Sequence, residues 1–178
     1  MIETARLLLR GWRADDAEAH HAMCADPGIV AHLGGPPSLS DSREVVERQN
    51  RLLSDTGSCF WAMELRGTGS FIGWCGLKPG PAETPIAGER EIGWSVAAPC
   101  WRRGFAREAA EACLAYGWDR LDLGEVAAIT AAGNVRSIGL MERLGMVAFP
   151  GETFDHPDLA VDDPLRRHVV YRIARPAS

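Results

Sequence analysis

The centre of the chain combines two hydrophobic patterns, one with a period of two and one with a period of three to four. Residues Glu91–Val96 alternate apolar with small or polar side chains, which is typical of a half-buried strand. Pro99 ends this strand because proline cannot donate a hydrogen bond to a neighbouring strand. From Arg107 to Leu121, small apolar residues recur at spacings of three and four and predict one face of a helix. The centre is therefore predicted to be a strand, a short loop and a helix.

Upstream of this centre, the pattern predicts a strand, two helices and a hairpin. The expected elements are a strand at 3–10, a helix from Asp15 and Asp16 to about Cys24, a helix that begins with Asp41 and Glu44 in a capping arrangement, and strands at 59–65 and 71–77. Residues 78–90 are rich in proline and glycine and are expected to form a loop. The first half should therefore be an antiparallel meander with helices on one side.

Downstream of the centre, a second strand makes the sheet mixed. A strand–helix–strand order implies a right-handed parallel crossover from the central strand. The expected elements are a strand at 125–131, a helix at 134–144 that stops at a left-handed Gly145, a strand from Met146, an irregular segment at 150–167 and a final strand at 168–173. No linker, repeat or low-complexity run divides the chain. We therefore predict one α+β domain over residues 1–178.

Composition narrows the class of protein. The 178 residues are 46% hydrophobic and 24% charged, which is ordinary for a globular domain. A net charge of −5 argues against nucleic-acid binding as the main function. The five cysteines are scattered without a C-x-x-C pair, which favours reduced thiols in the cytoplasm over a disulfide framework. Neither a signal-peptide pattern nor an apolar run long enough to span a bilayer is present, so we expect no membrane association.

The loop between the central strand and helix has the composition of a phosphate-binding turn. It carries Arg102, Arg103 and Gly104, and Arg107 follows at the start of the helix. A helix N-terminus presents unpaired backbone N–H groups, and its dipole attracts anions such as phosphate. Gly104 lacks a Cβ and would let the backbone approach a diphosphate closely. The alternative is a tight turn with solvated arginines, but the preceding strand and the alanine-rich helix favour phosphate binding.

Three motifs occur in a specific order. The first is Glu3-Thr-Ala-Arg-Leu-Leu-Leu-Arg with the helix that follows it, the second combines Glu91-Ile-Gly-Trp with residues 99–106, and the third is Asn134-x-x-Ser-x-x-Leu-x-x-x-Leu-Gly-Met. This order resembles the GNAT superfamily of acetyl-CoA-dependent N-acetyltransferases, and more narrowly its RimJ/RimL-type branch. The resemblance implies a mixed, mostly antiparallel twisted sheet of six to seven strands. It also implies a central parallel pair that splays to hold the cofactor, and about four flanking helices.

The resemblance also implies where acetyl-CoA binds. Backbone groups on the central strand would hold the pantetheine arm, here at Ser95, Val96 and Ala97. The loop and the first helical turn would hold the pyrophosphate, here at Arg102, Arg103, Gly104, Phe105, Ala106 and Arg107. Asn134 resembles a position whose side chain contacts the cofactor arm. It also has the character of a helix N-cap, and the two roles are compatible.

Acetyl transfer to an amine needs a base, a donor for the developing oxyanion and a proton for the leaving thiolate. The resemblance implies that a backbone N–H near Val96 is the oxyanion donor. Glu91 is the candidate base, acting through water, and its alternative is a surface carboxylate at a strand edge. Met141 stands where many members carry a tyrosine acid, so Ser137 is the candidate acid. The alternative for Ser137 is helix packing or capping.

His156 and His168 lie in or beside the irregular segment near the C-terminus. One hypothesis is that they help to bind or deprotonate the acceptor. The alternative is that they hydrogen-bond a long loop to the body of the protein. No H-x-x-x-H or paired-thiolate spacing exists, so no metal site is expected.

The leading functional hypothesis is transfer of an acetyl group from acetyl-CoA to a primary amine, by direct attack in a ternary complex. The acceptor would be a protein or peptide N-terminus or a small-molecule amine. The alternative is a non-catalytic acyl-CoA-binding or sensor protein of the same fold, which the missing tyrosine favours. A nucleotide-binding oxidoreductase does not fit, because no early G-x-G-x-x-G unit exists. A homodimer is compatible with the branch.

Overall fold

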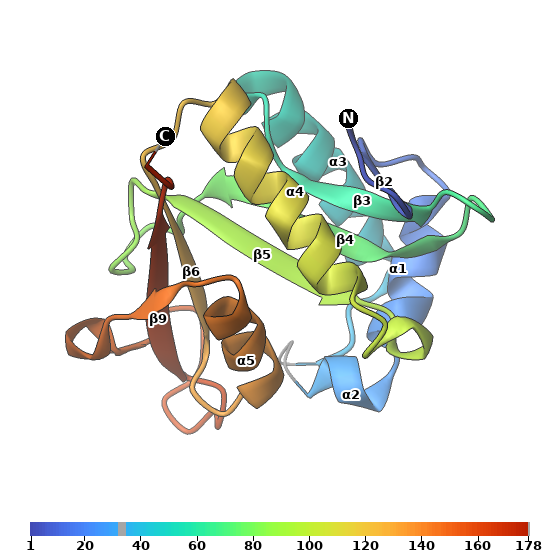
Figure 1. The fold of residues 1–178 in the computed structure, drawn as a ribbon. Helices are drawn as coiled ribbons and strands as arrows, with labels where there is room; N and C mark the ends of the chain where they lie inside the picture. Colours follow the sequence, from blue (N-terminus) through green and yellow to red (C-terminus); the bar gives the residue numbers. More distant parts are fainter. Residues whose placement is uncertain (32–34, 178) are drawn as a thin grey trace.

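The computed structural model describes residues 1–31 and 35–177, and in this part nine strands form one mixed sheet. The strands are β1 (Ile2–Glu3), β2 (Leu7–Arg10), β3 (Phe60–Leu65), β4 (Phe71–Pro79), β5 (Arg90–Val96), β6 (Glu125–Ala131), β7 (Val147–Ala148), β8 (Phe154–Asp155) and β9 (Arg167–Ala174). Their order is β1-β2-β3-β4-β5-β6-β9-β7, and β8 also pairs with β9. All pairs are antiparallel except β5 and β6 (Figure 1). The expected mixed sheet with one central parallel pair is confirmed.

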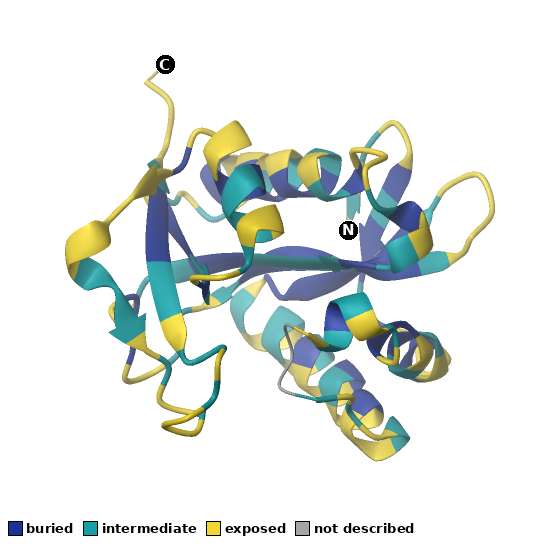
Figure 2. Cartoon of the chain, turned by 90° about the horizontal axis from the view of Figure 1, so that it is seen from below, coloured by how far each residue is buried: buried dark blue, intermediate teal, exposed yellow. Residues whose placement is uncertain are grey.

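Helices cover both faces of this sheet. They are α1 (Asp16–Cys24), α2 (Pro27–Val30), α3 (Leu39–Thr56), α4 (Phe105–Arg120) and α5 (Val135–Arg143), with two short 3-10 turns at Ala98–Cys100 and Pro150–Glu152. In Figure 2 the sheet is seen nearly edge-on, with α1, α2 and α3 on one side and α4 and α5 on the other. The expected meander of β1 to β5 is confirmed, and the helices of the first half share one face as predicted.

The alternation of side chains along each strand explains the two layers. Trp61 and Met63 of β3 are fully buried in the core that lies under α4. Ala62, between them in the sequence, packs on the other face with Ala17 of α1 and Val46 of α3. Because successive side chains of a strand point to opposite faces, one apolar strand can serve both cores. This explains why β3 begins with an unbroken apolar run, Phe60–Met63.

The sheet separates between its two parallel strands. β4 pairs with β5 along the whole of β5, from Arg90 to Val96. In contrast, β5 pairs with β6 at a single bridge, between Glu91 and Ala127. Beyond this bridge the two strands diverge, and β6 instead pairs along its whole length with β9. The predicted splay is therefore present, and the backbone of β5 faces a gap rather than a partner.

The N-terminal segment differs from the prediction of one strand at 3–10. Thr4 and Leu7 form a tight turn, with the Thr4 amide donating to the Leu7 carbonyl at 2.9 Å, and this turn splits the segment into β1 and β2. No glycine or proline marks the turn. The Thr4 hydroxyl holds it, because it accepts from the Leu7 amide at 2.9 Å and donates to the distant Glu108 at 2.6 Å. The capping prediction for α3 is also wrong in position. Ser38 is the N-cap, and Asp41 completes its capping box from the third helical position.

The C-terminal half contains short elements that the sequence analysis missed. The segment expected to be irregular at 150–167 holds a 3-10 turn and β8, and β7 starts one residue after Met146. In the described residues, β8 and the division of the N-terminal segment into β1 and β2 raise the count of strands to nine from the six or seven expected. Over the same residues, α2 makes five helices instead of about four. Elements this short depend on pairing with a neighbour, such as β9, and leave no periodic pattern in the sequence. The left-handed stop at Gly145, with φ of 83°, is confirmed.

A buried ion network fixes α1 to the sheet. Arg10 of β2 donates to both oxygens of Asp16, at 2.6 and 2.9 Å, and to Glu64 of β3 at 2.7 Å. All three side chains are almost completely buried, and Arg13 adds a partly exposed contact to Glu64 at 2.8 Å. Because an unpaired charge in such a place is costly, the network allows one position of α1 against β2 and β3.

Candidate active site

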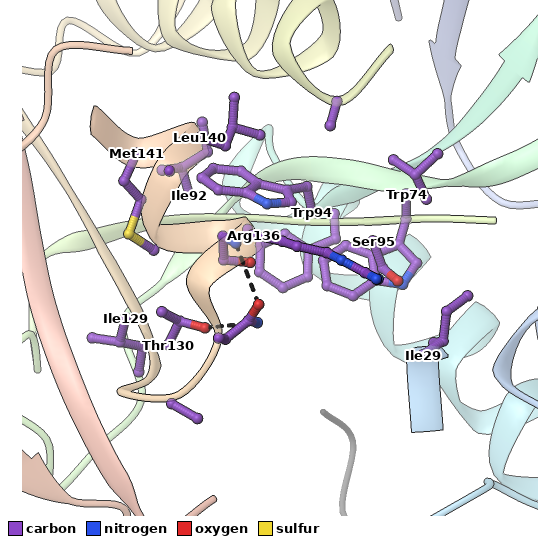
Figure 3. Close-up of a pocket in the computed structure, with 18 of the residues that line it drawn as sticks. Ile29, Trp74, Ile92, Trp94, Ser95, Ile129, Thr130, Arg136, Leu140 and Met141 are labelled. Carbon is purple, nitrogen blue, oxygen red and sulfur yellow. Dashed lines mark hydrogen bonds between the residues drawn. The ribbon is translucent and has the colours of Figure 1, made fainter. Parts of the chain in front are cut away.

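A cavity of about 1100 Å³ lies where β5 and β6 separate. Its walls come from β4, β5, β6, the first turn of α4, one face of α5 and residues from the segment 156–168. Figure 3 shows Ile129 and Thr130 of β6 across the cavity from Trp94 and Ser95 of β5. The cavity therefore occupies the gap in the sheet and is open to side chains from both faces.

Strand alternation divides this cavity into two sides. Ile92 of β5 packs in the core under α4, so Trp94, which shares its face, lies on what we call the α4 side. Glu91 points to the opposite face, which we call the α1 side. Lys78 of β4 and His168 of β9 also lie on the α1 side, because Leu77 and Val169, the residues next to them in the sequence, pack in the α4-side core. A molecule that filled the cavity would thus contact two chemically different surfaces.

The α4 side begins with a turn of unusual backbone conformation. Arg102 and Gly104 both have left-handed backbones, with φ of 58° and 81°. A left-handed arginine is uncommon, and turns of this kind aim successive amides at one point. The first amides of α4, from Phe105 to Arg107, have no acceptor within the helix. Because Arg102 and Arg107 also line the cavity here, the turn has the features of an anion-binding site.

A second set of contacts holds this turn in place. The Phe105 ring is buried, and the guanidinium groups of Arg6 and Arg103 lie 4.5 and 5.0 Å from its centroid. Arg6 also donates to the Arg103 carbonyl at 2.9 Å and to Glu108 at 2.6 Å. Arg103 lies outside the cavity lining, whereas Phe105 and Ala106 belong to it. The geometry makes Arg103 a support of the loop rather than a group beside the predicted pyrophosphate.

The backbone of β5 presents alternate residues to the gap. The Ala97 amide donates to the Ile72 carbonyl of β4 at 2.9 Å, so Ala97 and, by alternation, Ser95 direct their backbone groups towards β4. Trp94 and Val96 direct theirs towards the gap. The expectation that Ser95 and Ala97 present backbone groups to the pantetheine arm is therefore corrected. Val96 keeps its predicted position, and Trp94 joins it.

Trp101 forms one end of the cavity and ties three segments together. Its indole Nε1 donates to the Val96 carbonyl at 2.6 Å. The Arg136 guanidinium of α5 lies 4.2 Å from its ring centroid, and Figure 3 shows the Arg136 side chain reaching across from α5 towards β5. A Cβ on Gly28 would lie only 2.6 Å from the indole, so α2 can pack here because residue 28 is glycine.

Helix α5 places three predicted positions at the cavity. The Asn134 side chain caps the helix by accepting from the Ser137 amide at 3.3 Å, and it donates to Thr130 of β6 at 3.1 Å (Figure 3). The predicted N-cap is therefore confirmed, and both Asn134 and Ser137 line the cavity. Met141 is buried and also lines it, so an apolar thioether, which cannot donate a proton, faces the cavity here.

Glu91 lies on the α1 side and is not a surface carboxylate. It is 8% exposed, and one of its oxygens lies 2.7 Å from the Lys78 ammonium. Burial raises the pKa of Glu91 above its usual range, while Lys78 and the nearby His156 act in the opposite direction. A carboxylate with a raised pKa inside a cavity is suited to accept a proton near neutral pH. The alternative of an exposed strand-edge glutamate is wrong.

His156 and His168 lie together on the α1 side, with ring centroids 4.9 Å apart. Both make contacts expected from loop anchoring, because His168 Nδ1 lies 3.1 Å from the Arg166 carbonyl and His156 Nδ1 accepts from the Asp158 amide at 3.3 Å. Both rings also line the cavity that contains Glu91. The two interpretations from the sequence are therefore compatible, and a role in catalysis stays a prediction.

Some cavity residues were missed from the sequence. The sequence predicts a loop at Lys78, but this residue belongs to β4 and lies opposite Glu91 in the β4–β5 register. Phe60 and Trp74 stack at 4.7 Å on the α1 side, and the Lys78 ammonium lies 5.3 Å from the Phe60 ring centroid. The alternation of β3 and β4 could have placed these aromatic rings on one face. The register of β4 on β5 could not be predicted, because the connecting loop is long.

Other kinds of site are not found in the described residues. Within 1–31 and 35–177, no group of three or more histidine, cysteine or carboxylate side chains is arranged to hold a metal ion. Over the same ranges, no helix has the length and apolar character needed to cross a membrane. All five cysteines are free and buried, and burial raises the pKa of Cys59 to about 12.

The splayed sheet, the anion-binding turn and the cavity between them define an acetyltransferase of the GNAT family. The chain belongs to this family, because residues 6–147 match the acetyltransferase (GNAT) domain. It is 34% identical to the uncharacterised protein YkkB of Bacillus subtilis over 146 residues, which cover 82% of this chain and 84% of that one. It is 30% identical to an FsC-acetyl coenzyme A-N(2)-transacetylase of Aspergillus fumigatus, over 96% of this chain and 76% of that protein. Among solved structures, an acetyltransferase from Agrobacterium tumefaciens is 28% identical and superposes with a TM-score of 0.78 over 98% of this chain and 94% of that one.

Proposed function

We propose that this protein transfers an acetyl group from acetyl-CoA to a primary amine by direct attack within a ternary complex. The observation that carries the proposal is a cavity that passes through the sheet, with an anion-binding turn on its α4 side and a buried carboxylate on its α1 side. One side suits a polyphosphate cofactor and the other suits an amine that must lose protons. A similar protein of Aspergillus fumigatus is named for acetyl coenzyme A, which supports the donor.

The residues at the α4 side fit the parts of acetyl-CoA. The turn from Arg102 to Arg107 would take the pyrophosphate through its amides and two guanidinium groups. The Trp94 backbone and the Val96 amide, which have no β6 partner at this depth, would pair with the pantetheine arm, while the Val96 carbonyl accepts from Trp101. The coenzyme would supply the acetyl group as a thioester. Asn134 would complete the contact with the arm while it caps α5.

The chemistry assigned to the chain is proton transfer and charge stabilisation. Glu91 would accept a proton from the attacking nitrogen, directly or through water, with its pKa raised by burial. A backbone N–H of the β5 residues that face the gap would stabilise the negative charge developing on the carbonyl oxygen. Ser137, which lines the cavity from α5, would return a proton to the sulfur. Holding the reactants together in this cavity would supply much of the remaining acceleration.

A second candidate is a non-catalytic acyl-CoA-binding protein, and one observation favours it. Met141 occupies the position of the usual tyrosine and cannot donate a proton. This candidate has the same coenzyme site but predicts no turnover with any amine. The narrower placement in the RimJ/RimL-type branch, the cytoplasmic location, the single domain over 1–178 and a homodimer stay predictions as well.

The proposal is tested first by calorimetric titration of the protein with acetyl-CoA and, as a control, with NAD. We expect saturable binding of acetyl-CoA and none of NAD. A second assay separates the acetyltransferase from the non-catalytic binder. The protein is mixed with acetyl-CoA and then with each of a panel of primary amines, and the release of free thiol is measured. Absence of acetyl-CoA binding would reject both, and binding without amine-dependent thiol release would favour the second.

A further inference from the structure

The two cavity histidines are fixed by the backbone in opposite tautomers. His168 Nδ1 lies 3.1 Å from the Arg166 carbonyl, and a carbonyl only accepts, so this nitrogen must carry the proton. His156 Nδ1 lies 3.3 Å from the Asp158 amide, which only donates, so this nitrogen must be unprotonated in the neutral ring. Neutral His168 therefore has its lone pair at Nε2, and neutral His156 has its proton at Nε2. The loop backbone fixes this arrangement in the absence of any substrate.

The proposed reaction must remove two protons from the acceptor nitrogen. A basic primary amine enters as an ammonium ion, and its nitrogen has no lone pair until one proton has left. A second proton leaves as the N–C bond forms and the C–S bond breaks. One of the two ends on the thiol of the coenzyme and the other ends in solvent. Glu91 is proposed for the second transfer, so the first transfer needs another acceptor.

Resting on the proposed function, we propose that His168 Nε2 takes this first proton from the bound ammonium ion and gives it up to water once the product has left the cavity. His168 would thus be a catalytic residue. The neighbouring His156 ring, with centroids 4.9 Å apart, does not compete for this proton. Its Nδ1 accepts from the Asp158 amide and its Nε2 already carries a proton.

The surroundings keep His168 neutral and ready to accept a proton. Burial lowers the pKa of His168, and the neighbouring His156 lowers it further, against the hydrogen bond to the Arg166 carbonyl, which raises it. The other ionisable groups around the pair are Asp155, Asp158, Arg166 and Arg167 on its own segments, Lys78 and Glu91 across the cavity, and Arg136 and Arg143 on α5.

The tautomers can be tested without any knowledge of the acceptor. Nitrogen-15 correlation spectra of the histidine rings in the wild-type protein should show His168 protonated at Nδ1 and unprotonated at Nε2 near neutral pH, with His156 showing the reverse. Finding the proton on Nε2 of neutral His168 would overturn the proposal, because that nitrogen could not then accept. This measurement needs no acetyl transfer, so it tests the tautomer of His168 separately from the proposed function.

The kinetic test compares two amines of nearly the same shape, 2-phenylethylamine and its much less basic 2,2-difluoro analogue. His168→Gln should lower kcat/KM for 2-phenylethylamine at neutral pH by about 100-fold. The loss should shrink for the difluoro analogue, and for both amines at alkaline pH, because the nitrogen is then already neutral. An equal loss for both amines, or no loss, would refute the proposal, since a structural defect does not distinguish amine basicity.

A matched control uses a histidine with the same backbone contact outside the cavity. His21 Nδ1 lies 3.0 Å from the Pro37 carbonyl and does not line the cavity. His21→Gln should leave the pH profile with both amines unchanged. If the wild-type protein acetylates neither amine while it binds acetyl-CoA, the proposed function fails for these acceptors, whereas a wrong tautomer in the ring spectra overturns the His168 proposal alone.

Discussion

Replacement of Gly104 by valine tests the proposed coenzyme turn. Gly104 has a left-handed backbone with φ of 81°, and a β-branched residue there costs on the order of 1–3 kcal/mol. The loop can relieve this strain by leaving the left-handed region, which turns the first amides of α4 away from their common point. Losing one hydrogen bond to a charged phosphate costs about 1.5–3 kcal/mol, or roughly a tenfold to hundredfold weaker Kd for acetyl-CoA.

The control variant for this prediction is Gly88→Val. Gly88 has a similar φ of 86°, nothing lies within 4 Å of its would-be Cβ, and it lies outside the cavity lining. Both variants should lose similar stability in urea unfolding, but only Gly104→Val should lose affinity for acetyl-CoA in calorimetry. Gly104→Asn should bind better than Gly104→Val, because asparagine tolerates the left-handed region. Wild-type affinity in Gly104→Val would refute the placement of the pyrophosphate.

Three further predictions concern stability and chemistry. Arg10→Met leaves two buried carboxylates without their partner and should lower the free energy of unfolding by about 3–5 kcal/mol, whereas Arg13→Met, with a half-exposed side chain, should cost less than about 1 kcal/mol. Similar shifts of the urea midpoint in the two variants would contradict this account. Glu91→Gln should leave acetyl-CoA affinity unchanged and lower turnover by about 10²–10⁴-fold. Burial raises the pKa of Glu91, and only its ionised form can accept a proton, so wild-type turnover should be lost as pH falls through that raised pKa. The residual turnover of Glu91→Gln should not show this loss at low pH. Ser137→Ala should slow turnover without weakening acetyl-CoA binding, and unchanged turnover would remove Ser137 as the acid.

The sequence predicts the centre of this fold well because the centre has long periodic elements. β5, α4 and β6 each carry a clear pattern, and their order alone implies the parallel crossover that creates the gap. The cap at Asn134 and the stop at Gly145 are also local features. Local patterns therefore predict these elements and their order, whereas the splay of β5 from β6 is implied only by the resemblance to the GNAT superfamily.

What the sequence could not predict depends on contacts between distant segments. The turn after Thr4 is held by Glu108, which lies more than a hundred positions away in the chain. Lys78 lies beside Glu91 only because of the β4–β5 register, which a long connecting loop leaves undetermined. The backbone groups of β5 that face the gap are those that do not pair with β4. A shift of the β4–β5 register by one residue would turn the other set of backbone groups towards the gap. Ser95 and Ala97 were misplaced for this reason.

The central claim is that the cavity catalyses acetyl transfer to an amine. The most direct test is to incubate the purified protein with acetyl-CoA and a panel of amines, including peptide N-termini, amino acids, polyamines and aromatic ethylamines. Thiol release would be followed, and the products identified by mass spectrometry. The account predicts thiol release that depends on a particular amine and matches the amount of its acetamide. Saturable acetyl-CoA binding with no amine-dependent thiol release across the panel would contradict it and leave the protein a binder of the coenzyme.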